Sequence, residues 1–178
     1  MPQKVPALAV VAVALAVWMT GCARTPPARR GRPAPDAVGK TLVLEAPRLN
    51  GAVVQLAPGS GKVRVVDFWA SWCQPCRASL PHLDGLAREF GGAGVEVFGV
   101  AVDDDEAEVE SFLAEVPVAF PILWDQGGVR STAAKLPVVR LPTTLIVDRR
   151  GVIRFVHEGW TERVAREQRD QVRALLRE

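Results

Sequence analysis

A buried strand that leads directly into two closely spaced cysteines constrains this chain more than any other feature. Residues 63–69 are apolar except at Arg64 and Asp67, and a C-x-x-C motif follows at residues 73–76. Apolar side chains then recur at helical spacing, and Pro75 is tolerated in the first turn of a helix. The pattern predicts a strand that delivers two thiols to a helix N-terminus, where the helix dipole and free backbone N–H groups favour a thiolate over a thiol. Disulfide exchange needs this arrangement.

Two other uses of a C-x-x-C pair stay open, a structural disulfide and half of a zinc site. A zinc site of the common kind would need a second such pair or two histidines. No cysteine follows Cys76, and the spacing of the two histidines, His82 and His157, suggests no pair. Each histidine is expected at the surface or at an interface. We therefore expect neither a metal nor a cofactor.

Two motifs far apart in the chain resemble those of the thioredoxin superfamily. Residues 69–76 read WASWCQPC, and residues 141–144 read LPTT. The two together are similar to the motifs of extracytoplasmic, membrane-attached thiol–disulfide oxidoreductases of the TlpA/ResA type, with AhpC/TSA redoxins as wider relatives. The resemblance runs from about Pro47 to the C-terminus. It implies an α/β thioredoxin-like fold, with helices flanking a central mixed β-sheet and an added N-terminal β-hairpin.

The two cysteines are expected to act in a fixed order, because access decides which sulfur reacts first. Cys73 would attack a substrate disulfide, and the more buried Cys76 would then attack the mixed disulfide and release the reduced substrate. The resemblance further implies that Pro142 is a cis-proline against the active-site disulfide, so that the backbone of Leu141 can pair with a substrate strand. A trans proline that begins a strand is the alternative. The other residues expected to contact substrate are Trp72, Gln74 and Pro75.

Asp67 interrupts the apolar strand six residues before Cys73. A buried carboxylate is destabilising unless it is paired or protonated. Asp67 resembles the buried aspartate of thioredoxins, whereas TlpA/ResA proteins more often have Asn there and a glutamate at the position of Ser79. We predict that Asp67 has a raised pKa and deprotonates Cys76. The alternative is a half-exposed aspartate without a role.

Two tryptophans flank the loop before the motif. Trp69 and Trp72 are expected to line the site and to offer an apolar surface to partners. Ordinary packing is an equally good interpretation for Trp69.

The N-terminal region differs in composition from the rest. Residues 5–19 are apolar apart from Pro6, a length that suits a secretory signal better than a membrane-spanning helix of about 20 residues. Residues 19–22, MTGC, resemble the lipobox of bacterial lipoproteins, which implies an acylated Cys22 and accounts for the odd third cysteine. Cleavage near residues 14–16, or an uncut anchor, is the alternative.

These features divide the chain into a lipoprotein signal peptide (residues 1–21), an extended Pro/Arg-rich tether (22–39) and a thioredoxin-like domain (40–178). The tether arginines would touch anionic lipid headgroups or simply be solvated. We expect a protein held by lipid in the bacterial cell envelope and facing the periplasm or the cell exterior.

Charge gives no sign of a nucleic-acid partner. The formal net charge is +2, and residues 37–178 carry 17 basic and 19 acidic residues. The acidic run at residues 103–105 is interpreted as the solvated start of a helix rather than a metal site. The other expected elements are a hairpin of residues 41–44 and 52–56, strands at 95–102, 120–124, 143–147 and 152–156, and helices at 128–136 and 161–177.

The leading functional interpretation is a thiol–disulfide oxidoreductase that reduces disulfide-containing protein substrates, with electrons from a thiol-type donor in the membrane. The resemblance suggests apocytochrome c or copper-site cysteines as substrates. A peroxiredoxin-like thiol peroxidase would need a Thr before the attacking cysteine and an Arg for peroxide, whereas Ser71 and Trp72 precede Cys73. A Sco-type copper chaperone spaces its cysteines by three residues and adds a histidine ligand. Here the spacing is two, and His157 lies on a predicted hairpin strand.

Overall fold

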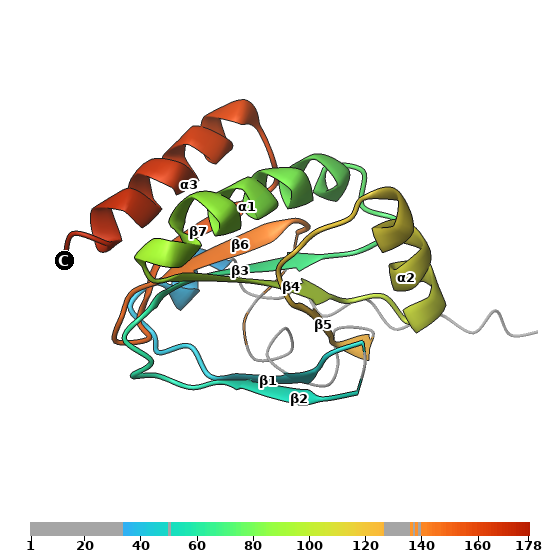
Figure 1. Cartoon of the computed structure of the whole chain (residues 1–178), viewed down its shortest axis with the longest axis horizontal. Coiled ribbons are helices and arrows are strands. Elements are labelled where there is room, and N and C mark those ends of the chain that lie inside the picture. Colours follow the sequence, from blue (N-terminus) through green and yellow to red (C-terminus); the bar gives the residue numbers. More distant parts are fainter. Residues whose placement is uncertain (1–33, 50, 127–135, 137, 139) are drawn as a thin grey trace, which may run out of the picture.

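Five strands form the central sheet, in the order β5-β4-β3-β6-β7 (Figure 1). β3 pairs in parallel with β4 and antiparallel with β6, and the outer pairs are β4–β5 (parallel) and β6–β7 (antiparallel). Every residue of β3 is buried, as expected for a central strand with apolar side chains on both faces. The bounds are β3 Val63–Trp69, β4 Val95–Ala101, β5 Ile122–Trp124, β6 Thr143–Val147 and β7 Ile153–Glu158.

The structure, a computed structural model, describes residues 34–49, 51–126, 136, 138 and 140–178. The expected signal peptide, Cys22 and the tether up to residue 33 lie outside the described residues, as does the helix expected at 128–136 apart from Leu136. In the described part of the chain, no helix has both the length and the apolarity needed to cross a bilayer.

Helices cover one face of the sheet. α1 (Cys76–Phe90) and α3 (Glu162–Leu175) lie across it, and α2 (Glu106–Glu115) packs beside them through Val109 and Phe112. Thr161 caps α3 by accepting a hydrogen bond from the backbone N–H of Val164 at 3.2 Å. The described residues also include two short 3₁₀ turns, η1 (Ala34–Ala37) and η2 (Gly91–Ala93).

The other face of the sheet is covered by a hairpin of β1 (Leu44–Pro47) and β2 (Val53–Leu56). The hairpin was expected, but its first strand begins later than predicted. The side chains of Leu44 and Ala46 are buried in the core. This alternation fixes the register of β1 against β2, in which Leu44 lies opposite Leu56. Thr41 instead forms an isolated bridge with Val152. The α/β fold predicted from the sequence, a mixed sheet flanked by helices with an added N-terminal hairpin, is confirmed.

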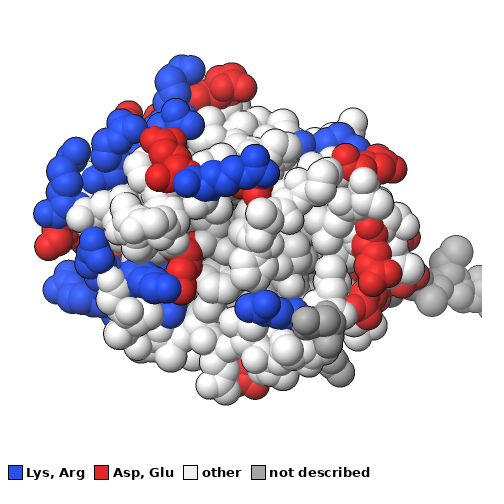
Figure 2. All heavy atoms as spheres, in the orientation of Figure 1, with Lys and Arg blue, Asp and Glu red and all other residues white. Residues whose placement is uncertain are grey.

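Charge is unevenly distributed over the surface. Basic residues gather at the end formed by α3 and the β6–β7 turn, and acidic residues gather around α2 (Figure 2). The basic groups at the turn are Arg149, Arg150 and Arg154, and the acidic groups of α2 are Glu106, Glu108, Glu110 and Glu115.

Candidate redox site

The two cysteines of the C-x-x-C motif form a disulfide between the end of β3 and the first residue of α1. The S–S distance is 2.04 Å. Tight turns shape the loop, with Cys73 N–H donating to Ala70 O at 3.1 Å and Cys76 N–H donating to Cys73 O at 3.0 Å. Cys73 is 5% exposed and Cys76 is fully buried, so Cys73 is the more accessible of the two cysteines.

The residues expected to contact substrate differ in their exposure. Trp72 is 69% exposed. Gln74 and Pro75 are also exposed, and Leu141 is half-buried. The Leu141–Pro142 peptide bond is cis, the isomer that the resemblance implied.

Trp69 does not line the surface of the site. Its side chain is fully buried and packs on Phe112 with a centroid distance of 5.0 Å. The packing interpretation is therefore correct for Trp69, which belongs to the same core cluster as the two cysteines.

Asp67 is fully buried in β3, so the half-exposed alternative is wrong. It alternates with Val65 and Trp69, which belong to the same core cluster as Cys76, and its side chain therefore faces the α1 side of the sheet. The Thr144 hydroxyl donates to Asp67 Oδ1 at 2.6 Å, and Oδ2 has no hydrogen-bond partner among the described residues. Burial raises the pKa of Asp67 to about 7, against the lowering effect of Thr144. The raised pKa predicted from the sequence is confirmed.

Asp103 is a residue of the site that the sequence interpretation missed. It was expected to be solvated, but it is 1% exposed. Its carboxylate accepts hydrogen bonds from the Ser71 backbone N–H at 3.0 Å and the Ser71 hydroxyl at 2.6 Å, and its carbonyl accepts one from Trp124 Nε1 at 2.9 Å. Only Asp105 acts as the expected cap of α2. Asp103 follows β4, and polar groups at the carboxyl ends of neighbouring parallel strands meet at one edge, so its position was a usable signal.

Gln168 is the second missed residue. It lies on the buried face of α3 and donates from Nε2 to the Thr144 hydroxyl oxygen at 3.0 Å. The available signal was a polar residue in an otherwise apolar helical stripe, since Val164 and Val172 lie four positions away on either side.

A cavity of about 490 Å³ adjoins the redox loop. Two of its lining residues, Arg77 and Glu115, form an ion pair of 2.9 Å. The Arg77 guanidinium also lies 4.8 Å from the centre of the Phe112 ring. The cavity is thus lined by a buried aromatic ring and by an exposed ion pair. Its lining residues are Ser71, Trp72, Arg77, Ala107, Glu108, Ser111, Phe112 and Glu115.

The two histidines contact different residues. His82 is half-buried against Trp160, and His157 Nε2 lies 2.7 Å from Gln171 Oε1. Among the described residues, no group of three or more His, Cys, Asp or Glu side chains is placed to hold a metal ion.

Comparison with known proteins gives a matching family model and relatives with related names. The model of the AhpC/TSA family matches residues 31–156, more than half of the chain. Thioredoxin-like protein YneN of Bacillus subtilis is 34% identical over 143 residues, which cover 79% of this chain and 78% of YneN. Thiol-disulfide oxidoreductase ResA of Oceanobacillus iheyensis is 33% identical over 131 residues, which cover 74% of this chain and 66% of ResA.

Solved structures agree with these relatives. A crystal structure from Chlorobium tepidum, provisionally described as a thiol:disulfide interchange protein DsbE, has a TM-score of 0.72 at 30% identity, with 79% of this chain and 98% of that chain covered. A secreted Mycobacterium tuberculosis disulfide oxidoreductase has a TM-score of 0.61 at 26% identity, with 74% and 95% covered.

Proposed function

The chain belongs to the AhpC/TSA family and is a thiol–disulfide oxidoreductase, and from this we propose that it is a lipid-anchored reductant of protein disulfides outside the cytoplasm. The observation that carries the proposal is the Cys73–Cys76 disulfide, in which Cys73 is 5% exposed and Cys76 is fully buried. Relatives named thiol-disulfide oxidoreductase ResA support the reaction class.

The reaction begins with the reduced pair. The Cys73 thiolate attacks one sulfur of a substrate disulfide, forms a mixed disulfide and releases the other substrate sulfur as a thiolate. The Cys76 thiolate then attacks the Cys73 sulfur, which closes the Cys73–Cys76 disulfide and releases the second substrate thiol. Two electrons pass from the enzyme to the substrate, and a thiol-type donor in the membrane restores the dithiol.

Asp67 is the proposed base for the second step. Its burial leaves it with a pKa of about 7, close to the pH at which a general base works best. Its Oδ2 atom, which lacks a hydrogen-bond partner among the described residues, is available to take the Cys76 proton. The acid lies on the strand β3, in place of the helix glutamate that TlpA/ResA proteins carry at the Ser79 position.

The substrate is proposed to lie over the exposed surface beside Cys73. Trp72, Gln74 and Pro75 offer an accessible patch, and the adjoining cavity of about 490 Å³ extends it towards α2. Pro142 and Leu141 would border the opposite side, where the Leu141 backbone pairs with a substrate strand. Apocytochrome c and copper-site cysteines are the substrates that the resemblance to TlpA/ResA proteins suggests.

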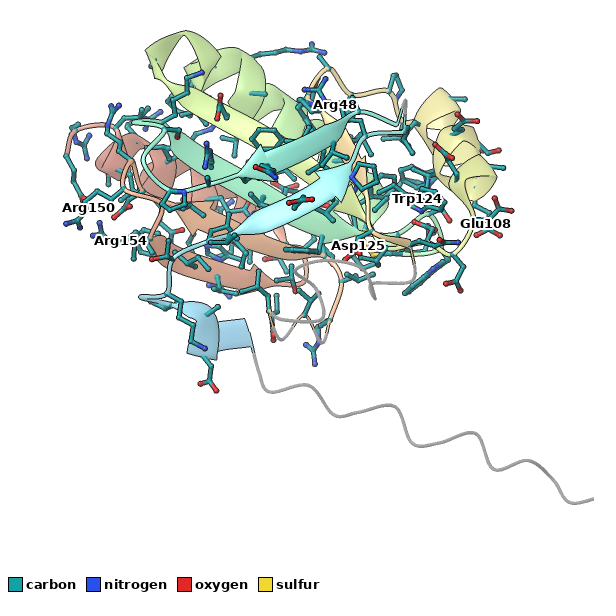
Figure 3. All side chains as sticks on the ribbon, turned by 90° about the horizontal axis from the view of Figure 1, so that it is seen from below. Arg48, Glu108, Trp124, Asp125, Arg150 and Arg154 are labelled. Atoms are coloured by element: carbon teal, nitrogen blue, oxygen red, sulfur yellow. A yellow bond between two sulfur atoms is a disulfide. The ribbon has the colours of Figure 1, made fainter. Side chains whose placement is uncertain are left out.

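The position of the chain's N-terminal part supports anchoring with the redox site directed away from the membrane. Gly39 N–H donates to Ile153 O at 2.8 Å, so the proposed tether joins the domain beside the β6–β7 turn. That turn lies at the start of β3, because Arg64 pairs with Val147, whereas Cys73 follows the other end of β3. Figure 3 likewise shows Arg150 and Arg154 at one end of the molecule and Trp124 and Glu108 at the other.

Reduction of insulin disulfides by the full chain, with dithiothreitol as electron source, tests the activity. We expect insulin reduction that disappears in Cys73→Ser. Two assays on the same preparation test the alternative functions. Peroxide consumption tests for a thiol peroxidase, and Cu(I) binding tests for a Sco-type chaperone. Peroxide consumption without insulin reduction, or tight Cu(I) binding by the pair, would replace the proposal.

Two further measurements test direction and anchoring. A glutathione titration of the pair should give a potential near that of thioredoxin, ~−270 mV, and a value near that of DsbA, ~−120 mV, would make the protein an oxidant. Cys22→Ser should move the protein from the membrane fraction to the soluble fraction, and unchanged membrane attachment would refute a lipid anchor at Cys22.

A further inference from the structure

A chain of three buried polar side chains connects the centre of the sheet with α3. It consists of Asp67 on β3, Thr144 on β6 and Gln168 on α3, and each of the three side chains is almost completely shielded from solvent. Thr144 Oγ1 lies 2.6 Å from Asp67 Oδ1, and Gln168 Nε2 lies 3.0 Å from Thr144 Oγ1. The chain crosses an otherwise apolar layer, where polar groups are destabilising unless they are hydrogen-bonded.

The chemistry of the donors fixes the direction of these hydrogen bonds. The amide Nε2 of Gln168 can only donate, so the Thr144 oxygen accepts from it. A hydroxyl has one proton, and Thr144 donates it to Asp67 Oδ1. Both bonds therefore run towards the carboxylate, and the hydroxyl is held as a donor to the ionised form of the acid.

We propose that Gln168 is a positioning residue for Asp67: by donating to the Thr144 hydroxyl, it directs that hydroxyl at the carboxylate and lowers the proton affinity of the acid beside the redox pair. Gln168 does not touch the sulfurs and acts through Thr144 alone. The consequence for turnover rests on the proposed function, in which Asp67 takes the Cys76 proton.

The other end of the Gln168 amide faces His82 on α1. Gln168 Oε1 and His82 Nε2 are both buried and lack hydrogen-bond partners among the described residues. Burial, helped by Arg169, lowers the pKa of His82, whereas Gln168, Glu162 and Glu89 raise it. The amide orientation that presents Nε2 to Thr144 is given by the 3.0 Å contact with the Thr144 hydroxyl itself.

The charged groups around this chain lie at its outer end. Arg169, Glu162 and Glu89 act on His82, whereas the shift of Asp67 comes from burial and Thr144. Cys73 and Cys76 belong to the core cluster on this side of the sheet and do not titrate as a disulfide. In the oxidised protein the two thiols therefore do not contribute, and His82, whose pKa is lowered by burial, is the neighbouring titration to follow beside that of Asp67.

The test is the titration of the Asp67 carboxyl carbon by ¹³C NMR in the oxidised full chain, with the signal assigned by its loss in Asp67→Asn. Gln168→Met keeps the side-chain length and removes the donor, so the pKa of Asp67 should rise, by at most the roughly one unit expected for loss of the Thr144 hydrogen bond to the charged carboxylate. Thr144→Val, which keeps the side-chain shape, should raise it by a similar amount. The double variant should rise no further than Thr144→Val alone.

Gln171→Met is the matched control, because Gln171 lies on the same helix and bonds to His157 instead. It should leave the Asp67 titration unchanged. An unchanged titration in Gln168→Met, or a double variant equal to the sum of the single shifts, would overturn the proposal. Because no substrate is present, this outcome is separate from failure of the proposed function, which would appear as Asp67→Asn with an unchanged exchange rate across pH 6–9.

Discussion

Asp103 holds Ser71 through both its backbone and its side chain. One carboxylate oxygen accepts from the Ser71 N–H at 3.0 Å and from the Ser71 hydroxyl at 2.6 Å, and the other lies 3.2 Å from the same N–H. Ser71 belongs to the loop between β3 and Cys73, so an acid at the end of β4 fixes the path that leads to the nucleophile.

Asp103→Ala should loosen this loop. Hydrogen bonds to charged groups contribute about 1.5–3 kcal/mol, so we expect a loss of that order in the free energy of unfolding, together with slower insulin reduction. Urea unfolding and the insulin assay measure the two effects. Asp104→Ala is the control, because Asp104 is exposed and its substitution should stay within about 0.5 kcal/mol. Equal behaviour of the two variants would contradict a specific role of Asp103.

Cys76→Ser should accumulate a covalent adduct with the substrate. Without the buried thiol, the mixed disulfide formed at Cys73 cannot be resolved within the protein. Non-reducing electrophoresis after incubation with a disulfide-containing protein should show a band that dithiothreitol removes. Cys73→Ser serves as the comparison and should give no such band; a band of equal strength there would reverse the assigned order of attack.

The stability of the oxidised protein should fall as pH rises from about 4 to about 7 through Asp67. The unfolded chain releases this proton near the ordinary pKa of 3.8, whereas the folded protein keeps it until about 7. The folded state binds more protons over that interval, so the free energy of unfolding decreases with pH by up to roughly 4 kcal/mol. Urea unfolding at several pH values, compared with Asp67→Asn, isolates this contribution.

The quantity to follow is the difference in the free energy of unfolding between the wild type and Asp67→Asn, because other carboxyl groups titrate too. Asp148 and Glu96 have lowered pKa values and lose their stabilising effect at the acidic end of the range. A difference that stays constant from pH 4 to 8 would mean that Asp67 titrates normally.

Gly99→Ala should destabilise the core beneath the disulfide. An added Cβ would lie 2.7 Å from Ile122 Cδ1 and 3.0 Å from Trp69 Nε1. Overpacking of this kind typically costs about 1–3 kcal/mol. We expect a lower urea midpoint and an altered near-ultraviolet circular dichroism signal from the displaced Trp69. Gly85→Ala, where an added Cβ meets no atom within 4 Å, should instead keep or raise stability.

Local sequence patterns were sufficient for the central part of the fold. The apolar strand before Cys73 and the helix after Cys76 depend on residue periodicity and a helix start, both of which act over a few residues. The burial of Asp67 was also predictable, because its neighbours in β3 are apolar on both sides. The first strand of the hairpin was predicted at residues 41–44 and lies at Leu44–Pro47. The position of the turn did not determine its register, which depends on which side chains pack against the sheet.

The contacts of Asp103 and Gln168 could not be derived in the same way. Asp103 is 32 residues from Ser71, and Gln168 is 24 residues from Thr144. Each contact exists only because the sheet order and the packing of α3 bring the two residues together. The polar character of both positions was visible in the sequence, but the partner of each depends on the tertiary fold.

The hydrogen bonds between residues 39–42 and the turn before β7 have a mechanical consequence. Gly39 N–H, Ile153 N–H and Leu42 N–H make three backbone bonds of 2.8–2.9 Å at this edge of the sheet. A pull on the N-terminal segment would be resisted first by these bonds and by β7, with β6 between them and the strand that carries the redox loop. Movement of the N-terminal segment would thus not be transmitted directly to the redox loop at the other end of the protein.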